Sequence, residues 1–248
     1  MEQIAIYPFP ENPTNNLNLF PLNVVVGNIV FHGTSSIYCD YIEANGFERG
    51  WSPFDENQGN EFVQMLSDLG MQDYIENKNS SRLSIRRYLE NRKVSSLSFA
   101  FGGYEALFYA TNLRLGGQIY LDIQNALSWI DKNELKLNDK QQSLYDIFYL
   151  KIKELHESKG CIYLLDFNKE NDIFYGDAYN DIAGSFQAAF FNGVLIDPSR
   201  IIGKMFIPKD YRLDNDLLKS SVKNTKINSQ TRGTYIFDLF SSFMEIKD

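Results

Sequence analysis

Apolar residues follow two patterns along this chain, and together they predict strands and helices in mixed order. Continuous or alternating apolar runs predict strands at 23–35, 94–101, 117–123, 161–167, 186–196 and 201–207. Apolar residues spaced three and four apart predict helices at 37–45, 61–74, 81–93, 104–112, 124–130 and 139–158. Strands outnumber helices in the second half, and the two kinds do not alternate regularly. We therefore expect an α+β fold rather than an alternating parallel sheet.

Polar and glycine-rich stretches mark the connections between these elements. We expect loops at 46–60 and 168–184. Asn192-Gly193 is typical of a tight turn, so the run 186–196 is either one strand or a pair of strands around that turn. Asp197 to Arg200 predicts a further turn before the last strand.

The length and the ends of the chain favour a single domain. Its 248 residues suit one domain, 1–248, with insertions. The core elements lie within 23–208. Four prolines within 1–22 predict an N-terminal arm with a strand-like start, and 209–248 reads as a polar C-terminal extension with helical character at 214–222.

Composition and charge narrow the classes of partner. Apolar residues make up 44% of the chain and aromatic residues 15%, which is ample for a core. The net charge of −8 argues against a broad, salt-dependent grip on nucleic acid. A local basic cluster could be either a solvated helix surface or a cradle for phosphate; it consists of Arg82, Arg86, Arg87, Arg92 and Lys93.

Cysteine usage and the first residues bear on the compartment. Cys39 and Cys161 are the two cysteines; they make no disulfide framework and have no metal-type spacing, which suits a reducing environment. The start MEQIAIYPFPENP lacks the basic and apolar regions of a signal peptide, and no apolar run approaches the length of a membrane span. We expect a cytoplasmic protein, in the cell that makes it or in one that it enters.

The first candidate site closes the strand predicted at 23–35. The run Phe31-His32-Gly33-Thr34-Ser35 brings an imidazole, a glycine and hydroxyl groups to one strand end. Imidazole offers a hydrogen-bond donor and an acceptor, glycine lets a ligand approach the backbone, and Thr34 adds a hydroxyl. The ordinary alternative for His32 is a hydrogen-bonded core histidine.

In two further segments, a predicted strand likewise lies next to a turn and to residues that could bind a ligand. In Ser98 to Ala110, SFAFGGYEALFYA, a strand runs through Gly102-Gly103 into a helix that carries Tyr109. In Gly184 to Ile202, a loop leads through Gln187 into an apolar run, a proline turn and an isoleucine-rich strand. The three segments follow one another between residues 31 and 202.

In this order the segments resemble the three motifs of the NAD-dependent ADP-ribosyltransferases of the diphtheria-toxin and poly(ADP-ribose) polymerase type. The resemblance implies a split β-sheet core with flanking helices, and NAD as the substrate that supplies ADP-ribose. It assigns His32 to the adenosine ribose, the Gly33 backbone to the nicotinamide carboxamide, and Tyr109 with a phenylalanine to the nicotinamide ring. The residues that it implies in NAD binding are His32, Gly33, Thr34, Ser98, Phe99 and Tyr109.

The third motif departs from the family at the position of its catalytic glutamate, where this chain has Gln187. The resemblance still implies a catalytic set of His32, Tyr109 and Gln187. However, glutamine carries no charge and cannot act as a base. Acids in the preceding loop are the alternatives for that role: Glu170, Asp177 and Asp181. The spacing of histidines, cysteines and acids predicts no metal site.

The resemblance implies a mono-ADP-ribosyltransferase that modifies a macromolecular acceptor, protein or nucleic acid, and releases nicotinamide. Family habit favours a bacterial toxin or antiphage effector, for which a neutralising antitoxin would be a further partner. Two alternatives stay open. One is an NAD-using RNA 2′-phosphotransferase, which the acidic charge disfavours; the other is a degenerate NAD-binding or interaction module, which Gln187 favours.

Overall fold

A computed structural model describes residues 4–11, 13, 19–20, 29–48, 51, 53–71, 85, 98–100, 103–111, 115, 118–166, 173–174, 188–191 and 195–213. Its strands are β1 (Ala5–Tyr7), β2 (Ile29–Ser35), β3 (Phe47–Glu48), β4 (Ser98–Ala100), β5 (Gly160–Asp166), β6 (Ile173–Phe174), β7 (Ala188–Phe191), β8 (Leu195–Ile196) and β9 (Ile201–Ile207). Its helices are η1 (Ser36–Tyr38), α3 (Cys39–Asn45), α4 (Glu56–Asp68), α7 (Gly103–Tyr109), α8 (Gln118–Lys132), α9 (Asp139–Glu157) and η4 (Pro198–Arg200).

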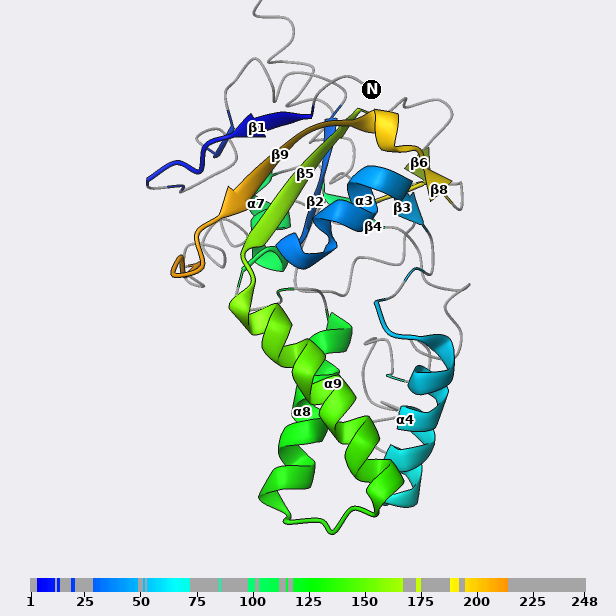
Figure 1. Ribbon diagram of the computed structural model, residues 1–248. Helices are drawn as coiled ribbons and strands as arrows, with labels where there is room; N and C mark the ends of the chain where they lie inside the picture. Colours follow the sequence, from blue (N-terminus) through cyan, green and yellow to red (C-terminus); the bar gives the residue numbers. More distant parts are fainter. Residues whose placement is uncertain are drawn as a thin grey trace, which may run out of the picture.

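A seven-stranded mixed sheet forms one part of the molecule, and α4, α8 and α9 extend away from it (Figure 1). The strand order is β1-β9-β5-β2-β4-β7-β6, while β3 and β8 make a separate two-stranded sheet. β1 lies parallel to β9, and the other described pairs are antiparallel. This combination of a mixed sheet and separate helices confirms the predicted α+β class.

Strand β2 separates two buried layers, because successive side chains of a strand point to opposite faces. Val30 packs into the cluster that contains α3, and His32 contacts aromatic rings of that same cluster. Phe31 packs into the second cluster with Ala106 and other residues of α7. Helices α3 and α7 therefore cover opposite faces of the sheet (Figure 1).

Two glycines let α7 lie unusually close to the sheet. A Cβ on Gly33 would stand 1.9 Å from the carbonyl oxygen of Ala106, and one on Gly160 would stand 1.7 Å from that of Ala110. Ser35 pairs with Gly160 across β2 and β5, so both glycines face the same way. The helix also presents alanines at this contact. The approach is thus backbone against backbone, which any larger side chain would prevent.

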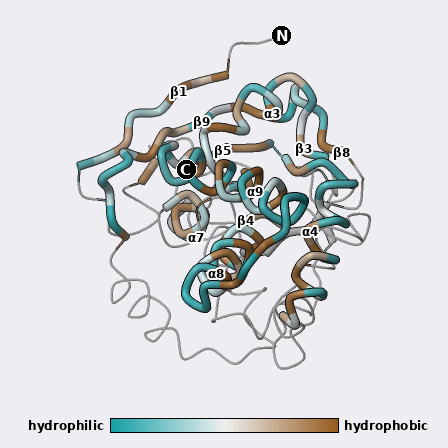
Figure 2. The backbone as a smooth tube through the Cα atoms, turned by 60° about the horizontal axis from the view of Figure 1, so that its bottom comes forward, coloured by the Kyte–Doolittle hydropathy of each residue, from teal (hydrophilic) through white to brown (hydrophobic). Residues whose placement is uncertain are grey.

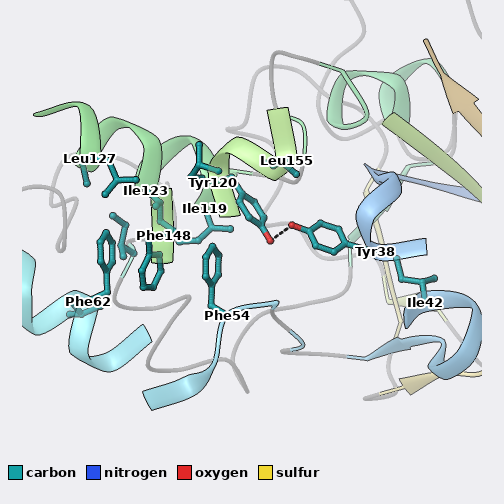
Figure 3. Packing of buried hydrophobic residues seen from close by; sticks show 14 of the residues in the cluster. Tyr38, Ile42, Phe54, Phe62, Ile119, Tyr120, Ile123, Leu127, Phe148 and Leu155 are labelled. Carbon is teal, nitrogen blue, oxygen red and sulfur yellow. Dashed lines mark hydrogen bonds between the residues drawn. The ribbon is translucent and has the colours of Figure 1, made fainter. Parts of the chain in front are cut away.

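The helical part continues the cluster on the α3 side of the sheet. Phe148 of α9 stacks between Phe54 and Phe62, at ring-centroid distances of 4.7 and 3.9 Å (Figure 3). The hydroxyl of Tyr38, in η1, donates a hydrogen bond to that of Tyr120, in α8. Figure 2 shows apolar and polar residues alternating along these helices, as expected where each buries one side. None of the described helices combines the length and apolar character that crossing a membrane requires.

Side-chain caps explain where two of these helices begin. Asp55 accepts hydrogen bonds from the backbone amides of Asn57 and Gln58 and starts α4. Asn138 and Gln141 bond each other's backbone amides in a capping box that starts α9. Leu144, Phe148, Ile152 and Leu155 are buried along α9. The amphipathic helix predicted at 139–158 is therefore confirmed.

Three predicted elements differ from the structure. The strand predicted at 117–123 is wrong: Ile119, Ile123, Leu127 and Ile130 are buried at helical spacing in α8. The loop predicted at 46–60 contains β3 and the first turn of α4. The strands on either side of Asn192-Gly193 both exist but do not pair with each other, because β7 joins the large sheet and β8 pairs with β3.

Other predictions are confirmed as far as the structure describes them. The helix predicted at 37–45 is η1 and α3, the strands at 161–167 and 201–207 are β5 and β9, and the strand-like start of the N-terminal arm is β1. Some predictions lie outside the described residues: the helix at 81–93 apart from Ile85, its basic cluster, most of the loop 168–184, and the extension from 214 onward.

We predict that Gly33→Ala destabilises the fold by about 3 kcal/mol or more, because the new methyl group would displace the backbone of α7. For a chain of this size, that loss lowers the midpoint of thermal unfolding by roughly 6–12 °C. Circular dichroism melting of the purified variant measures it.

Gly203→Ala is the matched control on the same sheet. Its Cβ would first meet the Tyr7 ring at 2.5 Å, a side chain that can shift, so a smaller loss is expected. Equal melting temperatures for Gly33→Ala and the unmodified protein would contradict the close contact.

Candidate functional site

His32 is half-buried on the α3 face of the sheet, between two aromatic rings. Its ring centroid lies 4.8 Å from that of Phe47 in β3 and 5.2 Å from that of Phe99 in β4. These strands are distant in sequence, so tertiary packing alone sets the orientation of the imidazole. A neutral imidazole can both donate and accept hydrogen bonds, so a ligand on this face could use either kind.

Polar side chains continue from His32 across the neighbouring strands. His32 pairs with Tyr163 of β5, and Tyr163 pairs with Lys204 of β9, so the three side chains form one row on this face. Glu43 of α3 covers the far end of the row. Its Oε1 accepts hydrogen bonds from the Tyr163 hydroxyl at 2.8 Å and from Lys204 Nζ at 2.6 Å.

The surroundings of Tyr163 and Lys204 determine the protonation states of these two side chains. Burial is the main reason why the pKa of the Tyr163 hydroxyl is raised, so the phenol stays protonated and remains a donor. Burial lowers the pKa of Lys204, but the hydrogen bond and charge of Glu43 outweigh it and the net shift is upward. The exposed fractions of the Lys204 and Glu43 side chains are 12% and 26%. The ion pair is therefore partly buried, and the upward shift in pKa keeps Lys204 charged at neutral pH.

Both cysteines lie beside this network. Cys39 begins α3 and Cys161 belongs to β5, and both are buried free thiols. Their mutual hydrogen bond and burial raise the pKa of Cys161, so it stays a thiol at neutral pH. Among the described residues, no group of three or more histidines, cysteines and acids is placed to hold a metal ion.

Four of the residues assigned to NAD binding lie near this site. Thr34 is buried two residues after His32, and Phe99 is 3% exposed, so its ring forms a wall of the core beside the imidazole. Ser98 begins β4, but its side chain is outside the described part of the chain. The side-chain position of Gly33 faces the α7 backbone, so a ligand cannot approach Gly33 from that side. The expected pairing of its backbone with the carboxamide stays a prediction.

Tyr109 comes from the opposite layer. It is half-buried at the end of α7, and its ring centroid lies 5.4 Å from that of Phe108. Helix α7 covers the face of the sheet opposite to the one on which His32 lies. The structure thus does not bring the His32 and Tyr109 side chains to one face of the sheet.

The third motif, 184–202, is described at 188–191 and 195–202. Gln187 and the alternative acids Glu170, Asp177 and Asp181 lie outside the described residues. The following strand, β7, pairs with β4 through Ala188 and Ala100, and β4 pairs with β2 through Ala100 and Phe31. The strands that carry the three motifs are therefore neighbours.

The motifs did not identify Glu43, Tyr163 or Lys204. One signal was present in the sequence: Lys204 is the single charged residue within the apolar strand IIGKMFI. A lysine at such a position needs a partner. The sequence does not show that the partner comes from α3, because 161 positions separate Lys204 from Glu43.

We predict that Lys204→Met destabilises the protein by about 2 kcal/mol, because the Glu43 carboxylate would lose a charge-assisted hydrogen bond at a partly buried position. Urea unfolding followed by circular dichroism measures the change.

Lys140→Met is the matched control. Lys140 also pairs with an acid, Glu61, at 2.9 Å, but those side chains are 71% and 47% exposed, so we expect a loss under about 0.5 kcal/mol. If both variants lost the same free energy of unfolding, the Lys204–Glu43 pair would contribute no more to stability than an exposed ion pair.

Comparisons with known proteins add no relative to this description. A scan against models of protein families finds no match, and searches of curated proteins and of solved structures find none either.

Proposed function

We propose that the protein is a mono-ADP-ribosyltransferase that moves ADP-ribose from NAD to a macromolecular acceptor. The observation that carries the proposal is the order of three strands. The motif resemblances were found in segments separated by more than sixty residues, yet their strands β2, β4 and β7 lie side by side in one sheet. Segments that serve one site must meet in space, and a chance set of short matches has no reason to do so.

The pairing of β2 is a second supporting observation. On the β5 side, pairing continues to Ser35 and Gly160. On the β4 side, the described pairing is confined to Phe31 and Ala100 and does not include the next positions, His32 with Phe99 or Gly33 with Ser98. The described ladder of β2 is thus shorter on the β4 side than on the β5 side, as the resemblance to a split sheet leads us to expect. NAD bound on this face would contact the imidazole, and a role for Tyr109, which lies on α7 across the sheet, stays a prediction of the resemblance.

Transfer of ADP-ribose from NAD requires little general acid or base catalysis from these residues. The glycosidic bond between C1′ of the ribose and the pyridinium nitrogen breaks, and nicotinamide leaves as a neutral molecule. The acceptor forms the new bond to C1′ and loses a proton. Positioning of NAD and acceptor is then the main contribution, and well-placed groups reach effective molarities of about 10⁵ M or more. Gln187 would hold a ribose hydroxyl by hydrogen bonding.

We predict that His32→Ala lowers NAD-dependent labelling of a cell lysate at least tenfold, because a lost hydrogen bond worth about 1.4 kcal/mol in the transition state costs that factor. The measurement uses purified protein, NAD labelled in the adenosine part, and separate protease and nuclease treatment of the product. His156→Ala is the matched control, since His156 is the other histidine of the chain and is exposed on α9.

Two further variants test the rest of the site in the same assay. Tyr109→Ala is expected to abolish labelling, and Gln187→Ala to reduce it strongly, whereas Gln187→Glu keeps or raises NAD hydrolysis. Full labelling by Tyr109→Ala or by Gln187→Ala would remove that residue from the site. Full labelling by a folded His32→Ala would refute the assignment of the first motif.

Gln187 favours one other function, NAD binding without transfer, because the position lacks the charge of the family's glutamate. Calorimetric titration with NAD separates the two. Binding without any labelled product supports the binding module, whereas label on protein or nucleic acid supports the transferase. Absence of both NAD binding and labelling would exclude both functions.

A further inference from the structure

The outer face of α9 carries apolar side chains that no other described element covers. Tyr149 is 48% exposed and Leu150 is 55% exposed, next to each other at the middle of this 19-residue helix. By helical periodicity, Leu150 lies opposite the buried stripe of Leu144, Phe148 and Ile152, and Tyr149 lies on the flank of that stripe. A helix that has already buried one side gains nothing for its own fold from a second apolar patch on the other side.

If two copies of this patch are related by a two-fold rotation, opposite charges of the two copies face each other. Asp146 lies three residues before Tyr149, and Lys153 lies three residues after Leu150; both are exposed. If two copies of α9 pack antiparallel with the axis between Tyr149 and Leu150, each Asp146 faces the partner's Lys153, and each Tyr149 faces the partner's Leu150. The next exposed positions give Gln142 opposite the partner's Glu157. No pair brings like charges together.

The aromatic residue at the centre is held in place before any partner arrives. The rings of Tyr149 and Tyr145 stack at 5.9 Å with planes 12° apart, and the Tyr145 hydroxyl donates a hydrogen bond of 2.7 Å to Asp131 of α8. A fixed ring loses little conformational entropy on binding, which favours its use as an anchor.

A hollow beside Tyr149 offers space for an apolar side chain. It has a volume of about 260 Å³ and lies between α8 and α9, with Leu127, Tyr149 and Ile152 among its walls. Lys153 and Glu157 line its edge and belong to the same outer face. The partner's Leu150, which meets Tyr149 in the antiparallel arrangement, lies next to this hollow.

We propose that the outer face of α9 is a self-association surface, through which two copies of this chain pack their α9 helices antiparallel about a two-fold axis between Tyr149 and Leu150. Such a contact is isologous and closed, so it ends at a dimer. At 1.5 Å per residue, α9 is about 28 Å long, and a single helix pair of that length makes a small interface of the weak or transient class. The proposal does not depend on the proposed enzymatic function, because it uses only residues of α8 and α9, and α9 extends away from the sheet (Figure 1).

Charge reversal tests the arrangement with the full-length protein. By sedimentation velocity at roughly 1 to 100 μM, we expect the unmodified protein to shift from monomer to dimer. Asp146→Lys and Lys153→Asp should each remain monomeric, since each places two like-charged pairs across the axis. An equimolar mixture of the two variants should dimerise again, because the mixed dimer restores opposite charges at both positions.

The controls separate this geometry from general electrostatics. Lys136→Asp changes the charge as much as Lys153→Asp but at an exposed loop position outside the face, so its dimerisation should be unchanged. Asp146→Lys also reduces the net charge of −8, which by itself would favour association. Circular dichroism checks that each variant folds. A monomeric unmodified protein at all concentrations, or a mixture of variants that stays monomeric, would overturn the proposal.

Discussion

The backbone contact between α7 and the centre of the sheet is the constraint on which the other features depend. Gly33 and Gly160 lie on adjacent strands. The backbone carbonyls of Ala106 and Ala110 lie so close to them that no side chain would fit. This contact assigns one face of β2 to α7. Because side chains alternate along a strand, it also directs the neighbouring His32 to the other face, where α3 and β3 surround it. One close approach thus decides both the packing of the core and the position of the candidate site.

The α3 face is unusual in combining an apolar core with a partly buried ion pair. Glu43 satisfies Tyr163 and Lys204 together, so the charged row beside His32 is internally paired. Such networks specify one arrangement of the elements that contribute to them, here α3, β5 and β9. The imidazole at the end of the row is held between Phe47 and Phe99. The described ladder between β2 and β4 is short beside it, and this is the region where the proposed function places NAD.

The molecule places its two candidate interaction surfaces far apart in structure. The candidate site lies on the sheet, whereas the outer face of α9 belongs to the helical part. The hydrogen bond between Tyr38 and Tyr120, together with the stacked rings of Phe54, Phe62 and Phe148, joins these parts in one continuous core (Figure 3). Association through α9 would involve the helical part of the molecule and not the sheet that carries His32.

Several elements were determined by the sequence itself. Local periodicity sufficed for α9, β5 and β9, because each has a pattern that its own residues complete. The same reasoning misassigned 117–123, where a short apolar run fits both periods and only burial in the core against α9 selects the helix. It placed His32 and Tyr109 in one pocket, although the residue next to His32 seats α7 on the opposite face. It also missed the partner of Lys204, which lies 161 positions away. Local patterns follow from the chemistry of neighbouring residues, whereas the facing of strands and the pairing of distant charges arise only when the chain is packed.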